Sequence, residues 1–155
     1  MMTRRVLIAG AAPLLAAQEP ASPPAFGNRG HIFARPSAKE KMIWCFSTVL
    51  GCGDPAVLKV PALAEPILAW RFPGGGSLSV EFTEKALDES RARYGAWMEI
   101  QTANPDALKK KILDAGLTQV HYPVTNTFYF MVPGGQVLGI VSGKNPSAGE
   151  LKNKP

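Results

Sequence analysis

A nine-residue pattern that occurs twice constrains the fold of this chain more than any other feature. Phe72–Val80 (FPGGGSLSV) aligns without gaps on Val132–Ile140 (VPGGQVLGI). Each copy places a Pro-Gly-Gly turn before a stretch of alternating residues, which is the pattern of a β-hairpin. A repeat of this kind indicates a duplicated supersecondary unit.

The segments around the two hairpins predict the same order of elements. Gly95–Ser142 is predicted as strand, helix, strand and closing hairpin. Its helix begins at Asn104–Asp106, which combines an N-cap, a proline at the first helical position and an acid at the positive end of the dipole. In the first half a helix is predicted over about 37–50, with Ser37 and Glu40 spaced as a capping box. Each half therefore reads β-α-β-β-β.

Periodicity within these elements separates a packed face from a second face. On the later helix, Leu108, Ile112 and Leu113 are predicted to form the buried stripe. On the strands, apolar residues alternate with polar ones, so one side of the sheet packs against the helices and the other is wet or lines a cavity. By strand parity, the residues on this second side are His31, Phe33, Ser79, Glu81, Trp97, Glu99, Gln101, Tyr129, Met131 and Gly139.

The start of the chain has the layout of a secretory signal peptide. Residues 1–17 (MMTRRVLIAGAAPLLAA) combine a basic start, an apolar run too short to span a bilayer, and small residues at the end. Thr3–Leu7 also resembles a twin-arginine export signal, and we expect cleavage after Ala16 or Ala17. A periplasmic or secreted location is therefore expected. The alternative is a cytoplasmic protein with an apolar N-terminus.

The remaining chain divides into a linker, a domain and a tail. Residues 18–29 are predicted to be a proline-rich linker, and 144–155 are predicted to be a flexible polar tail. The domain is expected over 30–143, with modules at about 30–83 and 95–142. With 46% hydrophobic residues, a chain of this length can bury one proper core.

The charge balance and the cysteines do not indicate a special partner. The formal net charge is +5, or +3 without Arg4 and Arg5 of the predicted leader. The remaining lysines read as a solvated helix face and tail, so we expect neither a nucleic-acid partner nor a stable membrane anchor. Cys45 and Cys52 are predicted to be free thiols, because one continuous helix would hold them too far apart for a disulfide. A chain reversal at Gly51 would shorten the distance between the two cysteines, so a disulfide is the alternative.

Four sequence features together resemble the vicinal oxygen chelate superfamily, which includes glyoxalases, extradiol dioxygenases, fosfomycin-resistance enzymes and bleomycin-binding proteins. They are the helix end Val49–Gly51 and the segments GAWMEI (95–100), NPDA (104–107) and YFMVPGGQV (129–137). The resemblance covers about 30–143. It implies an α+β fold in which paired βαβββ modules form a curved, open half-barrel sheet with helices on the convex side.

The resemblance also implies where a divalent metal would bind. Enzymes of the superfamily typically use His or Gln near the start of each module's first strand and Glu on its last strand. His31 fits the first of these places, but Trp97 occupies the equivalent place in the second half. The last-strand places fall at Ser79 and Gly139. No metal or other cofactor is therefore predicted.

A metal site built from neighbouring positions is the alternative. Glu81 lies two residues beyond Ser79 on the same face, and Glu99 shares a face with Trp97. His31, Glu81 and Glu99 are thus the candidate metal ligands of a metal-dependent lyase, isomerase or dioxygenase.

We expect a small-molecule ligand in the concave pocket, because a mixed aromatic and polar lining is typical of such sites. No catalytic residue is identified, and whether the chain is an enzyme stays open. A third hypothesis is a non-catalytic envelope protein whose concave face binds another chain, with a homodimer as one form. The predicted ligand-binding residues are His31, Glu81, Trp97, Glu99 and Tyr129.

Overall fold

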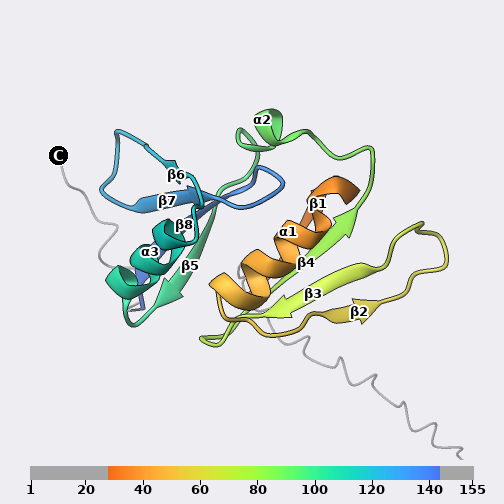
Figure 1. Ribbon diagram of the computed structural model, residues 1–155, viewed down its shortest axis with the longest axis horizontal. Helices are drawn as coiled ribbons and strands as arrows, with labels where there is room; N and C mark the ends of the chain where they lie inside the picture. The colour runs from red at the N-terminus through yellow and green to blue at the C-terminus, as the bar shows by residue number, and fades with distance from the viewer. Residues whose placement is uncertain (1–27, 144–155) are drawn as a thin grey trace, which may run out of the picture.

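Two four-stranded mixed sheets form the framework of the protein, seen here in a computed structural model that describes residues 28–143 (Figure 1). The predicted signal peptide, the tail and most of the predicted linker lie outside the described residues. The first sheet contains β1 (Arg29–Ala34), β2 (Ala56–Leu58), β3 (Ile67–Arg71) and β4 (Ser77–Phe82). The second contains β5 (Met98–Thr102), β6 (Gln119–Val120), β7 (Phe128–Met131) and β8 (Val137–Ser142).

The two sheets have the same topology. Their strand orders are β1-β4-β3-β2 and β5-β8-β7-β6. In each, the first strand pairs in parallel with the last, and the other neighbours are antiparallel. The predicted α+β fold of paired βαβββ modules is therefore confirmed, with sheets that stay open and do not close into a barrel.

The repeated sequence pattern corresponds to two equivalent turns. Gly75 N donates to Phe72 O at 2.9 Å, and Gly135 N donates to Val132 O at 2.9 Å. The glycines at these equivalent positions have positive φ angles, 107° for Gly75 and 93° for Gly135. Glycine adopts this conformation without steric cost, which explains why both turns carry it.

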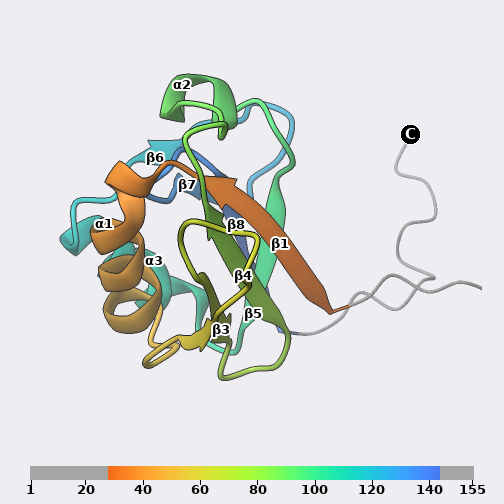
Figure 2. The same ribbon diagram turned by 90° about the vertical axis from the view of Figure 1, so that its right-hand side faces the viewer.

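Helices cover one side of both sheets. The first half has a helical stretch of η1 (Pro36–Ala38), α1 (Lys39–Ile43) and the π-helical η2 (Trp44–Val49). The second half has α3 (Pro105–Asp114), and α2 (Glu89–Ala92) lies in the connection between the halves. Figure 2 shows α1 and α3 on the same side of the strands.

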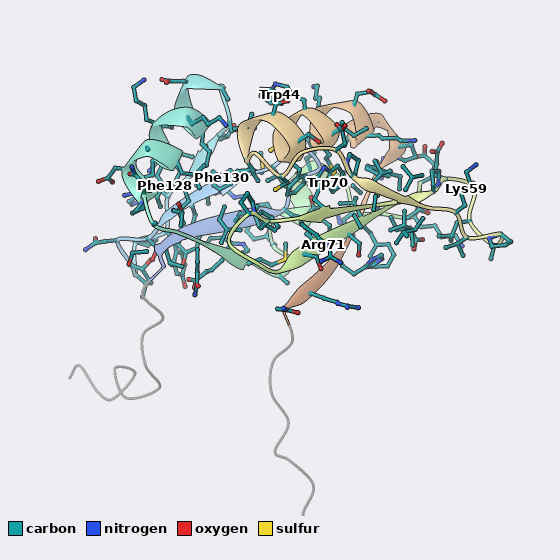
Figure 3. All side chains as sticks on the ribbon, turned by 90° about the horizontal axis from the view of Figure 1, so that it is seen from below. Trp44, Lys59, Trp70, Arg71, Phe128 and Phe130 are labelled. Atoms are coloured by element: carbon teal, nitrogen blue, oxygen red, sulfur yellow. The ribbon has the colours of Figure 1, made fainter. Side chains whose placement is uncertain are left out.

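The main hydrophobic core lies between the helices and the sheets and includes residues of both halves. Trp70 of β3 and Phe46 of η2 are fully buried, with ring centroids 5.1 Å apart. Phe130, labelled in Figure 3, and Leu138 bring the second sheet into the same core. Each fully buried side chain of this size stabilises the fold by about 1.5–3 kcal/mol relative to an exposed one.

Polar contacts also join the halves. Gln136 Nε2 donates to Phe33 O at 2.7 Å, which ties the second hairpin to β1. Lys111 Nζ donates to Thr48 O at 2.9 Å, which links α3 to η2.

The short helix α2 is tied to the turn between β7 and β8. Gly134 N donates to Glu89 Oε1 at 3.3 Å. The backbone of Gly135 lies so close to the backbone of Glu89 that no side chain fits between them. The connection between the halves therefore closes over the last hairpin.

Several local predictions are wrong. Ser37 and Glu40 do not form a capping box, because Pro36 begins a 3₁₀ turn and no side chain caps it. Leu113 is 49% exposed, since it lies about 100° around the helix from the buried Ile112. Arg29, assigned to the linker, is the first residue of β1.

Candidate functional site

Three polar side chains of the first sheet meet on the face opposite the helices. His31 Nδ1 lies 2.7 Å from Ser79 Oγ, and His31 Nε2 lies 3.8 Å from Glu81 Oε2. The His31 and Glu81 side chains are 39% and 21% exposed, so a solute can reach both. We call His31, Ser79 and Glu81 the polar group.

The strand register explains why these residues converge. β1 and β4 run parallel, with His31 opposite Ser79 and Phe33 opposite Glu81. Leu78 and Val80 point into the core, so the residues between them point the other way. The Phe33 ring meets the His31 ring edge-on at 5.0 Å and covers one side of the imidazole.

The contacts of Ser79 hold the His31 ring in place. Ser79 Oγ lies 2.7 Å from His31 Nδ1, where the tautomer of the ring decides which atom donates, and 3.3 Å from Gly30 O. The other ring nitrogen, Nε2, has no hydrogen bond to any of residues 28–143 and lies 3.8 Å from Glu81 Oε2. This nitrogen can form a hydrogen bond with a ligand or, in the neutral ring, coordinate a cation.

Glu99 does not complete a metal site with His31 and Glu81. It lies on β5 opposite Gly139 and is exposed. Within residues 28–143, no group of three or more His, Cys, Asp or Glu side chains is placed to hold a metal ion. Of the three candidate metal ligands, His31 and Glu81 lie close together. Two donors do not make a complete divalent-metal site.

Aromatic side chains dominate the same face of the second sheet. The Trp97 ring lies 4.9 Å from the Tyr129 ring and 5.2 Å from the Tyr122 ring. Trp97 Nε1 donates to Arg93 O at 2.8 Å, which fixes the indole. We call Trp97, Tyr122 and Tyr129 the aromatic cluster.

The members of the aromatic cluster differ in accessibility. Tyr129 is 8% exposed and packs with Val120 and Val137, so its ring is mainly structural. Tyr122 is 41% exposed and offers the accessible edge of the cluster. The sequence reasoning missed Tyr122, because the pairing of Val120 with Tyr129 that brings it to this face is seen only in the structure.

A separate cavity lies between the halves. It has a volume of about 420 Å³ and lies between the first hairpin turn and the connection from β5 to α3. None of the five predicted ligand-binding residues lines it, although Gln101, predicted on the second side of the sheet, does. Its lining includes Leu50, Phe72, Ile100, Thr102 and Leu108.

Both cysteines lie away from the polar group, in and after η2, and are free thiols. Burial raises the pKa of Cys45 to about 12, with a smaller contribution from Cys52. Burial also raises the pKa of Cys52, to about 11. Neither thiol is therefore a reactive nucleophile at neutral pH.

Comparisons with known proteins identify the fold. No protein-family model and no curated protein matches the sequence. An antibiotic-binding protein from a Streptomyces species matches the structure with a TM-score of 0.55 and 16% identity, covering 79% of this chain and 98% of that one. A member of the glyoxalase/bleomycin resistance protein/dioxygenase superfamily from Sphaerobacter thermophilus matches with a TM-score of 0.57 and 16% identity, covering 76% and 97%. A fosfomycin resistance protein from Listeria monocytogenes matches with a TM-score of 0.52 and 9% identity, covering 75% and 88%.

Proposed function

We propose that this chain, which has the vicinal oxygen chelate fold, binds a small molecule on the concave face of its two sheets. The ligand contacts the polar group of the first half and the accessible edge of the aromatic cluster of the second. Aromatic surface supplies apolar contact area, and the polar group fixes orientation.

The observation that carries the proposal is the accessible Nε2 atom of His31, whose ring is held in place by its contact with Ser79. A partly exposed imidazole held by Ser79 at 2.7 Å, with a carboxylate 3.8 Å from its other nitrogen, is ordered without being part of the core. Groups of this kind are preorganised to bind a ligand. Glu99, also predicted as a ligand contact, stays a prediction.

The solved structures with this fold support the same class of ligand. Among them are a protein named for binding an antibiotic and a protein named for fosfomycin resistance. At 16% and 9% identity, these likenesses support a small-molecule ligand as a class and do not select one.

A divalent-metal-dependent lyase, isomerase or dioxygenase is the second candidate. It is favoured by one observation, the 3.8 Å approach of His31 Nε2 to Glu81 Oε2, since imidazole and carboxylate are ordinary metal ligands. Against it, Trp97 and Gly139 occupy the places where the second half would supply donors.

Tryptophan fluorescence tests the proposed binding site directly. Trp97 lies at the concave face, Trp44 is 41% exposed on the helix and Trp70 is buried in the core. Candidate ligands, with fosfomycin and bleomycin among the first, are expected to change the fluorescence of wild type and of Trp44→Phe. The change should be absent in Trp97→Phe. A response that survives Trp97→Phe and is insensitive to His31→Ala would contradict the proposal.

Titration with Co²⁺ tests the metal candidate. If the metal binds at the concave face, His31→Ala and Glu81→Gln should each abolish stoichiometric binding. His121→Ala is the matched control, because His121 is the only other histidine of the chain and is exposed. Wild type that binds no Co²⁺ would end the metal candidate and leave the proposed binding site standing.

We further propose that the protein is exported to the periplasm or secreted, on the basis of the layout of residues 1–17. In the described part of the chain, no helix is both long and apolar enough to cross a membrane. Mass-spectrometric mapping of the mature N-terminus tests export, which predicts a start after Ala16 or Ala17.

The envelope-interaction and homodimer hypotheses stay predictions. Light scattering on the purified protein tests them by measuring its molar mass. A stable dimer that covers the concave face would also make ligand binding depend on protein concentration.

A further inference from the structure

Two arginines flank the same serine on the concave face. Arg29 of β1 and Arg71 of β3 are both register partners of Ser77 on β4. Because β4 lies between them, their Cα atoms are about 10 Å apart, which is two strand spacings. Strand alternation places all three residues on the side away from the helices. Figure 3 shows Arg71 on that side, and Trp70 towards the helix.

Within residues 28–143, neither guanidinium has a partner. Both arginines are exposed, and no hydrogen bond or ion pair joins either side chain to another of residues 28–143. By contrast, Lys39, Lys109 and Lys110 each pair with a carboxylate. Two neighbouring cations without a counter-charge repel each other, and an anion bound between them removes that repulsion.

The next row of the same face contains the polar group's histidine. His31 and Ala69 both pair with Ser79, two residues further along β4 than Ser77. The two rows are therefore about 7 Å apart. The Ala69 side chain is small, so the surface of β3 beside the arginines and His31 leaves room for a ligand.

We infer that the concave face binds a small organic acid whose carboxylate or phosphoryl group is held by Arg29 and Arg71. The inference rests on the proposed function and specifies its ligand class. A guanidinium binds either anion through two parallel hydrogen bonds, and the Ser77 hydroxyl provides a further donor. The other end of the ligand carries a hydroxyl, which can donate or accept a hydrogen bond, and this group reaches His31 Nε2.

Calorimetric titration with 4-hydroxyphenylacetate tests this geometry, because its carboxylate and hydroxyl are separated by about the distance between the two rows. The uncharged 4-hydroxyphenylacetamide is the matched control ligand, and inorganic phosphate supplies the anion alone. We expect the acid to bind most tightly, phosphate more weakly because it cannot reach His31, and the amide weakest. The affinity for the acid should fall as salt is added.

Substitutions identify the residues responsible. Arg29→Gln and Arg71→Gln should each weaken binding of the acid about tenfold, and the double variant should remove it. Lys59→Gln removes one positive charge far from Arg71 (Figure 3) and should leave binding unchanged. Arg71→Lys, which keeps the charge but loses the fork of donors, should give an intermediate affinity. Thermal unfolding of the arginine variants should match wild type, because both side chains are exposed.

Three results would overturn the inference: equal affinities for the acid and the amide, unchanged binding in both arginine variants, or no saturable binding of either the acid or phosphate. Amide binding that depends on His31 but not on the arginines would leave the proposed function standing while the anionic ligand class fails. Phosphate binding as tight as that of the acid would overturn the predicted spacing between the arginines and His31.

Discussion

The ring of Tyr129 covers Gly139, its register partner across β7 and β8. A Cβ atom at Gly139 would lie 2.7 Å from Tyr129 Cε1 and 3.3 Å from Thr127 Cγ2. The lack of a side chain at position 139 is therefore what lets Tyr129 pack beside Trp97. A metal-binding carboxylate at this position would have to displace the tyrosine ring.

Gly139→Ala is expected to lower the free energy of unfolding by about 1–3 kcal/mol, the usual cost of forcing an extra methyl group into a packed site. Urea denaturation measures the change. The cost should shrink when Tyr129→Ala is already present, because the clash is with that ring. Strictly additive effects of the two substitutions would contradict this explanation.

Gln136→Leu is expected to destabilise the fold by about 1–3 kcal/mol, because Phe33 O loses its buried hydrogen-bond donor. The loss is partly offset, since Gln136 Oε1 is buried without a partner and disappears with the substitution. Gln119→Leu, the same change at an exposed position of β6, is the control and should be near neutral in chemical denaturation. Equal effects at the two positions would argue against a structural role for the link to β1.

Alkaline pH is expected to destabilise the fold through its two thiols. Burial raises the pKa of Cys45 to about 12 and that of Cys52 to about 11, from an ordinary value of 9.0. Above pH 9.0 the unfolded state gives up protons that the folded state keeps, so the free energy of unfolding falls as pH rises towards the folded-state pKa values. Below the unfolded-state pKa this contribution is fully present.

Urea denaturation across this pH window, in the presence of a reductant, measures the thiol contribution. Cys45→Ala/Cys52→Ala should lose less stability with rising pH than wild type, whatever its stability at neutral pH. Lysine and tyrosine titrations are common to both proteins and cancel in the comparison. Parallel pH profiles would show that the thiols do not contribute.

Asn104→Ala is expected to lower stability by about 1 kcal/mol, because the Asn104 side chain accepts a hydrogen bond from Ala107 N at the start of α3. Thermal unfolding followed by circular dichroism measures the loss. Asn126→Ala, in an exposed loop, is the matched control, and Asn104→Asp should retain most of the stability. A control as damaging as Asn104→Ala would exclude the cap as the cause.

The hairpins and α3 could be predicted because their signals are local. A Pro-Gly-Gly turn between alternating residues specifies a hairpin by itself, and Asn104 caps the helix that follows it. The polar group followed from strand parity, since His31, Ser79 and Glu81 lie at alternating positions. The distances between these side chains could not be predicted, because they depend on the register of β1 against β4, and β2 and β3 separate these two strands in the sequence.

The failures come from competition between neighbouring signals. Ser37 has the spacing of a cap, but Pro36 starts the helical stretch before it. Arg29 and Arg71 were missed because each lies at a strand end, beside the predicted linker or a turn. Only the pairing of both with Ser77 brings them together, and no pattern within either strand indicates it.

The tie between Glu89 and the second hairpin decides where this chain can be cut. Although the two halves are duplicates in topology, α2 belongs physically to the second half, because Gly134 and Gly135 hold it there. A circular permutant or a two-fragment version of the protein would therefore be opened between Phe82 and Asp88, so that α2 stays with the second half.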